Sequence, residues 1–86
     1  MVRALSYFVY VLESLGNGER YVGMTSKPVE VRLQEHNSGS NKWTRANRPF
    51  KLLHSEPFES HFEATAREKF LKSGAGRKIR DALVGD

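Results

Sequence analysis

The sequence predicts a single α+β domain over residues 1–86, with a three-stranded, mainly antiparallel sheet flanked by helices in the order β-β-α-β-α-α. Three observations predict this fold class: an apolar segment that turns back on itself, two later segments with helical spacing, and a length that suits one modest core. The sequence has no repeats or low-complexity tracts. We therefore expect one small fold to perform the whole function.

The first two strands are expected to form a hairpin. Residues 7–12 are rich in aromatic and β-branched side chains, which favour strands. A Gly/Asn turn follows over 15–19, and Tyr and Val return over 20–24. The pattern is strand, turn, strand.

The first helix is expected to run to about Asn37. Thr25-Ser26-Lys27-Pro28 offers a hydroxyl N-cap with a proline in the first turn, and apolar residues then recur at helical spacing. A polar loop is expected over 38–41, and a third strand over 50–54.

A second helix is expected from the capping-box sequence at 60–63 through Lys72. Its apolar residues form two rows, so we expect contacts on two sides of this helix: Phe62, Ala66 and Phe70 in one row, and Ala64 and Leu71 in the other. A break at 74–76 precedes a short basic helix with Ile79 and Leu83 on one face.

Composition narrows the class of function. Lys and Arg total 14 against 10 acidic residues, and a formal net charge of +4 favours a polyanionic partner, although the same excess can serve solubility alone. The absence of cysteine excludes disulfides, thiol nucleophiles and Cys-ligated zinc. The longest apolar run, over 8–12, is too short for a membrane span, so we expect a cytoplasmic protein without a membrane partner.

Two tyrosines are candidates for handling a proton. Tyr10 lies on the first predicted strand and Tyr21 opens the second, so an antiparallel hairpin could bring both hydroxyls to one region of the sheet. A free tyrosine, with a pKa of about 10, would need a nearby cation or metal-bound water to accept a proton at neutral pH. The alternative is that both are ordinary strand aromatics.

The first helix supplies two candidates. Arg32 lies beside the apolar row, where a guanidinium could bind phosphate in bidentate fashion, or it could be a solvated helix residue. His36 could assist proton transfer or donate to a phosphate, or it could simply end the helix, where a cationic histidine is favourable.

Glu68 is the candidate metal ligand. A single carboxylate with waters and substrate oxygens is a normal way to hold Mg²⁺, with Mn²⁺ as a substitute. The alternative is an ion pair with Lys72, four residues later on the same helix.

Basic and aromatic residues provide candidate contacts to a nucleic acid. Trp43 could stack on a base, or it could cover the core. The candidates are Lys42, Trp43, Arg45, Arg48, Lys72 and Arg77.

The order of these residues resembles the GIY-YIG nuclease superfamily across nearly the whole chain. The resemblance rests on Phe8-Val9-Tyr10, Tyr21-Val22-Gly23, Arg32, His36-Asn37 and Glu63-Ala64-x-x-x-Glu68, in that order. It is nearest to the small free-standing bacterial members, which are similar at 35–39, 48–50 and 67–74.

The resemblance implies a metal-dependent endonuclease acting on DNA or another nucleic acid, with Mg²⁺ or Mn²⁺ and no small-molecule cofactor. Tyr10 would be the general base or a water-positioning hydroxyl, and Tyr21 would orient the nucleophile and the phosphate. Arg32 would stabilise the transition state, His36 would assist, and Glu68 would bind the single metal ion. Gly23 matches the motif glycine, where the lack of a side chain allows close approach.

The sequence departs from the family pattern in three ways. Phe8 replaces the first motif glycine, Val replaces Ile in both motifs, and no Asn occurs over 77–80, where the family's repair incision subunit carries one beyond its metal-binding Glu. These departures leave a second hypothesis open: a weakly active or inactive nucleic-acid-binding module on the same fold. The sequence leaves the oligomeric state and the choice between DNA and RNA open.

Overall fold

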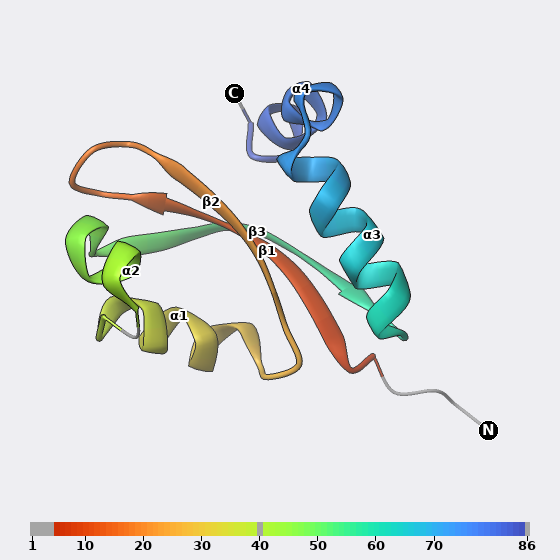
Figure 1. Ribbon diagram of the computed structural model, residues 1–86, viewed down its shortest axis with the longest axis horizontal. Helices are drawn as coiled ribbons and strands as arrows, with labels where there is room; N and C mark the ends of the chain where they lie inside the picture. The colour runs from red at the N-terminus through yellow and green to blue at the C-terminus, as the bar shows by residue number, and fades with distance from the viewer. Residues whose placement is uncertain (1–4, 40, 86) are drawn as a thin grey trace.

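The computed structural model describes residues 5–39 and 41–85, and it confirms the expected α+β architecture (Figure 1). Three strands form one sheet, and helices lie on both of its faces. In chain order the elements are β1 (Tyr7–Ser14), β2 (Arg20–Thr25), α1 (Val29–Asn37), α2 (Lys42–Asn47), β3 (Phe50–Phe58), α3 (His61–Lys72) and α4 (Gly74–Leu83). None of the helices in the described residues is long and apolar enough to cross a membrane.

The sheet is antiparallel throughout, with the strand order β2-β1-β3. Tyr10 pairs with Gly23 and Leu12 pairs with Tyr21 across the hairpin. Because directly paired residues project to the same face of a sheet, Tyr10 and Tyr21 lie on one face, as the hairpin predicts.

Each face of the sheet has its own buried cluster. Toward α3 and α4 the cluster is wholly apolar and consists of Val9, Val11, Val22, Ala64 and Leu71. Toward α1 and α2 it contains Tyr10, Leu12, Val29 and Phe50, and two further buried polar side chains, His36 and Thr44, lie on the helices that cover this face.

The structure adds the short helix α2, which was not expected. Asn41 begins it, because its side chain accepts a hydrogen bond from the Thr44 amide while the Thr44 hydroxyl accepts one from the Asn41 amide. This reciprocal cap places six residues in a helix within a segment that looked irregular in the sequence.

The expected hydroxyl cap of α1 is wrong. Pro28 occupies the N-cap position, and no side chain caps the helix there. The Thr25 hydroxyl instead accepts a hydrogen bond from the Lys27 amide at 3.0 Å, so it closes the turn before the helix rather than the helix itself.

Two other boundaries differ from expectation. Strand β3 continues to Phe58, and α4 begins at Gly74 because the Ser73 hydroxyl caps it by accepting from the Gly76 amide. Gly76 is buried where α4 crosses the end of α3, and a Cβ there would collide with the Phe70 carbonyl oxygen. Gly76 therefore allows close helix packing, and both Gly74 and Gly76 lie within α4 instead of breaking it.

Helix α3 begins as expected, with the Ser60 hydroxyl accepting from the Glu63 amide. Its expected contacts on two sides are wrong for the described residues. Ala64 and Leu71 are fully buried against the sheet, whereas Phe62 is 81% exposed and Phe70 is 39% exposed. Only one of the two apolar rows is buried.

Candidate functional site

Tyr10 lies beneath α1, beside the side chains of Arg32 and His36. It is 1% exposed, and its hydroxyl lies 2.8 Å from Nε2 of His36. Its ring passes directly over Gly23, where a Cβ would lie 2.5 Å from the Tyr10 hydroxyl and 2.8 Å from the Tyr21 ring. The motif glycine is therefore needed so that two tyrosine rings can pack over β2.

His36 is held against Tyr10 by the end of α1. The next residue, Asn37, accepts a hydrogen bond from the Phe50 amide at 2.6 Å and donates one to the Phe50 carbonyl at 3.3 Å. This pair of bonds ties the helix to β3. His36 is fully buried, and its Nδ1 has no hydrogen-bond partner among the described residues.

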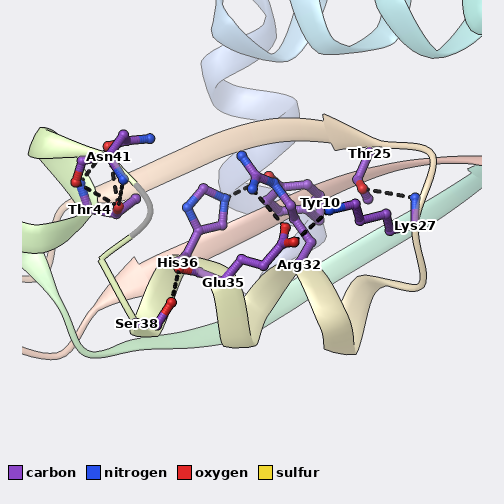
Figure 2. A network of polar contacts seen from close by, with 9 residues as sticks. All are labelled: Tyr10, Thr25, Lys27, Arg32, Glu35, His36, Ser38, Asn41 and Thr44. Carbon is purple, nitrogen blue, oxygen red and sulfur yellow. Dashed lines mark hydrogen bonds and ion pairs between the residues drawn. The ribbon is translucent and has the colours of Figure 1, made fainter.

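Arg32 lies one turn before His36 and projects to the same region (Figure 2). Its Nη1 lies 2.9 Å from Oε1 of Glu35, and the Nζ of Lys27 lies 2.5 Å from Oε2 of the same carboxylate. The guanidinium is also close enough to the Tyr10 hydroxyl to lower the pKa of that group. Arg32 therefore connects the buried hydroxyl with a surface ion-pair network.

Burial is the main influence on the protonation of Tyr10 and His36. Burial first, and then the neighbouring Tyr21, raises the pKa of Tyr10 to about 12, although Arg32 opposes the shift. Burial first, and then Arg32, lowers the pKa of His36 below its ordinary value of 6.5. At neutral pH both groups are uncharged, and the tautomer of His36 sets the direction of the hydrogen bond between the Tyr10 hydroxyl and Nε2. Arg32 is the nearby cation that a proton-accepting tyrosine would need, but it does not make Tyr10 a phenolate.

Glu68 lies on α3, which packs on the opposite face of the sheet from α1. Its side chain is 21% exposed, and Lys72 lies 3.3 Å from Oε2, so the ion pair weighed as the alternative is present. Thr65, three residues earlier on the same side of α3, contacts the sulfur of Met24 on β2 at 3.6 Å. The charge of Glu68 reaches Tyr10 and contributes to its raised pKa.

Glu68 fits a metal site of one particular kind. The described residues contain no group of three or more His, Asp or Glu side chains that could enclose an ion. A partly exposed single carboxylate suits Mg²⁺, which retains several waters and shares substrate oxygens, and it does not suit Zn²⁺ or Ca²⁺, which need more protein ligands.

An open groove of about 360 Å³ lies beside these residues, where the end of β2 meets α1 and α3. Lys27, Arg32 and His61 line it, together with the Thr25 and Ser26 residues of the connecting turn. Glu35 also lines the groove and pairs with both cations, so a phosphate group bound there would compete with this carboxylate for Lys27 and Arg32. Arg32 is common to the groove and to the environment of Tyr10.

Trp43 on α2 covers the aromatic side chains on the sheet face that packs against α1 and α2. Its ring stacks on Tyr21 with centroids 5.2 Å apart and on Phe50 with centroids 5.5 Å apart, and the residue is 37% exposed. It covers buried aromatics and still presents surface to solvent, so the two interpretations of this residue are compatible.

The candidate nucleic-acid contacts occupy two places in the fold. Lys42, Arg45 and Arg48 are exposed on or just after α2, around Trp43. Lys72 ends α3 beside Glu68, and Arg77 is exposed on α4. The structure therefore places one group on each side of the sheet.

Three groove residues were not expected from the sequence. Glu35 could have been found, since it lies three residues after Arg32 on one helix. Lys27 and His61 had no such signal in the sequence. Both reach the groove only because segments far apart in the sequence meet there.

Comparison with known proteins agrees with this architecture. Residues 6–80 match the model of the GIY-YIG catalytic domain. A UPF0213 protein of Listeria monocytogenes is 40% identical over 85 residues, covering 98% of this chain and 92% of that protein. A UPF0213 protein of Natronomonas pharaonis is 39% identical over 84 residues, covering 96% and 95%.

A solved structure is also similar. The solution NMR structure of the UPF0213 protein BH0048 from Bacillus halodurans has a TM-score of 0.54 and 35% identity, covering 90% of this chain and 81% of that one. The chain belongs to the GIY-YIG catalytic-domain family, and the relatives to which it is similar are small UPF0213 proteins.

Proposed function

We propose that this protein is a divalent-metal-dependent endonuclease that hydrolyses phosphodiester bonds in DNA or a related nucleic acid. Membership in a nuclease family supports the class of reaction. The proposal depends on the position of Tyr10. Its hydroxyl is hydrogen-bonded to His36, and the charges of both Arg32 and Glu68 influence its pKa. Side chains from α1 and α3 thus act on one hydroxyl of β1.

Tyr10 and His36 can accept the proton of an attacking water as a pair. The Tyr10 oxygen takes the proton from water while its own proton passes to Nε2 of His36. The lowered pKa of His36 keeps the imidazole neutral at neutral pH, and the tautomer with its proton on Nδ1 leaves Nε2 as the acceptor. Tyr10 then needs no phenolate form, which its pKa of about 12 would make rare.

Arg32 would stabilise the charge that develops on the phosphate, and Tyr21 would orient the water and the phosphate. Glu35 keeps the guanidinium at the groove before substrate arrives. Mg²⁺ or Mn²⁺ at Glu68, completed by waters and substrate oxygens, would supply Lewis-acid stabilisation of the phosphate and the leaving oxygen. Lys72 would release the carboxylate for that purpose.

A metal-dependent cleavage panel tests the proposal, using single-stranded, duplex and branched substrates with Mg²⁺ and Mn²⁺. Glu68→Gln should abolish cleavage while the circular dichroism spectrum stays unchanged. Arg32→Ala should lower the rate by about 10²- to 10³-fold, the usual effect of removing one transition-state donor.

Glu19→Gln is the matched control, because it makes the same chemical change at an exposed turn position and should leave cleavage intact. Undiminished Mg²⁺-dependent cleavage by Glu68→Gln would end the assignment.

The second candidate is a binding module that does not cut. The exposed cations around Trp43 favour it, because they could hold a nucleic acid without any help from Tyr10 or Glu68. A salt-sensitive gel shift without nicking in either metal would select this function.

A further inference from the structure

The carboxylate of Glu35 binds two cations of the groove as an anionic ligand would. Its Oε2 lies 2.5 Å from Nζ of Lys27 and its Oε1 lies 2.9 Å from Nη1 of Arg32, so each oxygen is bound by a different cation (Figure 2). The two non-bridging oxygens of a phosphodiester offer the same kind of acceptor pair, and ammonium and guanidinium groups bind both anions. The Glu35 side chain therefore lies where a phosphate of a substrate could bind.

The two cations come from separate elements of the fold. Lys27 lies in the turn between β2 and α1, whereas Arg32 lies on α1. Both line one groove, and Glu35 is the only acidic residue among the described residues that line it. Without this carboxylate, two positive charges would lie close together with only solvent ions to balance them. Glu35 thus holds the pair together in the unbound protein.

These ion pairs are exposed enough to exchange partners. The side chains of Lys27, Glu35 and Arg32 are 55%, 30% and 27% exposed. Ion pairs in contact with water contribute little to stability, because water solvates the separated charges well. A nucleic-acid backbone is a dense row of negative charges, and cations that bind it release condensed counterions. A backbone phosphate can therefore take both cations from Glu35, whose carboxylate then returns to water.

We propose that Lys27 is a further substrate-binding residue, which binds a backbone phosphate of the nucleic acid together with Arg32, and that Glu35 is an internal competitor that this phosphate displaces. This assignment rests on the proposed function for its ligand, a phosphodiester, and not for the cleavage step. Because Glu35 must leave before the phosphate binds, it lowers the affinity of this contact without touching the substrate.

Binding of a labelled duplex oligonucleotide tests the competition. Fluorescence anisotropy in EDTA measures it, so that no cleavage occurs. Glu35→Gln should bind about fivefold more tightly than the wild type at low salt, because the internal competitor and one repulsive charge are both removed. Glu30→Gln is the matched control, since it makes the same change in net charge at an exposed position of the same helix and should change the affinity far less.

A second substitution tests the contact of Lys27 with phosphate. In the Glu35→Gln background, Lys27→Met should weaken binding about fivefold and lower the slope of log affinity against log salt by about one, because one phosphate contact is lost. Lys69→Met, at an exposed position of α3, removes the same charge and should leave the slope unchanged. In the wild-type background, Lys27→Met should have a smaller effect, because the same substitution also weakens the competing Glu35 contact.

Three results would overturn the inference. They are unchanged or weaker oligonucleotide binding by Glu35→Gln, no effect of Lys27→Met in that background, and a Glu35→Gln variant that binds inorganic phosphate more tightly but the oligonucleotide no better. Because binding is measured without metal, a chain that binds as predicted but never cuts would contradict the endonuclease proposal alone. Cleavage that depends on Glu68, with oligonucleotide binding unaltered in Glu35→Gln, would contradict the role of Lys27 and Glu35 alone.

Discussion

The two faces of the sheet differ in what they bury. Beneath α3 and α4 the residues that alternate along β1, such as Val9 and Val11, meet only apolar partners. Beneath α1 and α2 the intervening Tyr10 meets His36, a fully buried imidazole. The same strand therefore contributes one side to the stability of the fold and the other to a polar pair.

The difference teaches where to look for chemistry in a small domain. Leaving His36 Nδ1 without a partner costs about 1–3 kcal/mol, which an apolar side chain would avoid. Retention of such a group on one face, while the other face is packed without one, favours a role for His36 beyond folding.

Truncation on the apolar face should have the largest effect on stability. Leu71→Ala removes a fully buried side chain from the α3 cluster and should lower the free energy of unfolding by about 2–5 kcal/mol. Urea titration measures it. Leu15→Ala, at a position 58% exposed, should change stability by less than about 0.5 kcal/mol.

At a temperature where the Leu71 variant remains folded, its cleavage rate should stay near the wild-type value. If Leu71→Ala instead kept its stability but lost cleavage, the apolar face would serve activity and not stability, which would contradict this account.

A substitution on the polar face should affect stability less and activity more. Gly23→Ala places a Cβ 2.5 Å from the Tyr10 hydroxyl, so the ring must move away from His36. Overpacking of this kind costs about 1–3 kcal/mol, and cleavage should fall sharply because the hydrogen-bonded pair is separated. Thermal unfolding and single-turnover cleavage measure the two effects.

Gly16→Ala is the matched control for this substitution. A Cβ at Gly16 meets only the Ser14 hydroxyl, at an ordinary 3.6 Å, so stability and cleavage should both persist. Full activity in Gly23→Ala would show that the Tyr10 position is not critical.

Local rules account for what could be predicted from the sequence. Strand alternation and hairpin pairing place Tyr10 and Tyr21 on one face, and the spacing of four residues places Arg32 and His36 on one side of α1. The order of the motifs supplied the family and, as proposals, the roles of these residues.

The rest depends on tertiary structure. The groove joins Lys27 to His61 across a large sequence separation, and no local pattern signals such a meeting. The exposure of Phe62 could not be predicted, because an apolar row on a helix looks the same whether a neighbour covers it or not. The pKa of Tyr10 is set by burial, which the sequence does not state.

The Tyr10–His36 pair should shape the pH dependence of the cleavage rate. This effect should be smaller than those of the substitutions at Leu71 and Gly23. The ordinary pKa of His36 is 6.5 and burial lowers it, so His36 is neutral in the folded protein above that pH. The unfolded chain binds the proton more readily, so stability also falls as pH drops below 6.5. Folding must therefore be checked by circular dichroism at each pH.

The single-turnover cleavage rate from about pH 5 to pH 10 tests the central claim most directly. The account predicts a rate that rises to a plateau near or below pH 6.5, because neutral His36 receives the proton through a Tyr10 hydroxyl that stays protonated throughout. A rate that instead climbs about tenfold per pH unit up to pH 10 would mean that a phenolate or hydroxide takes the proton, and it would contradict the Tyr10–His36 pair.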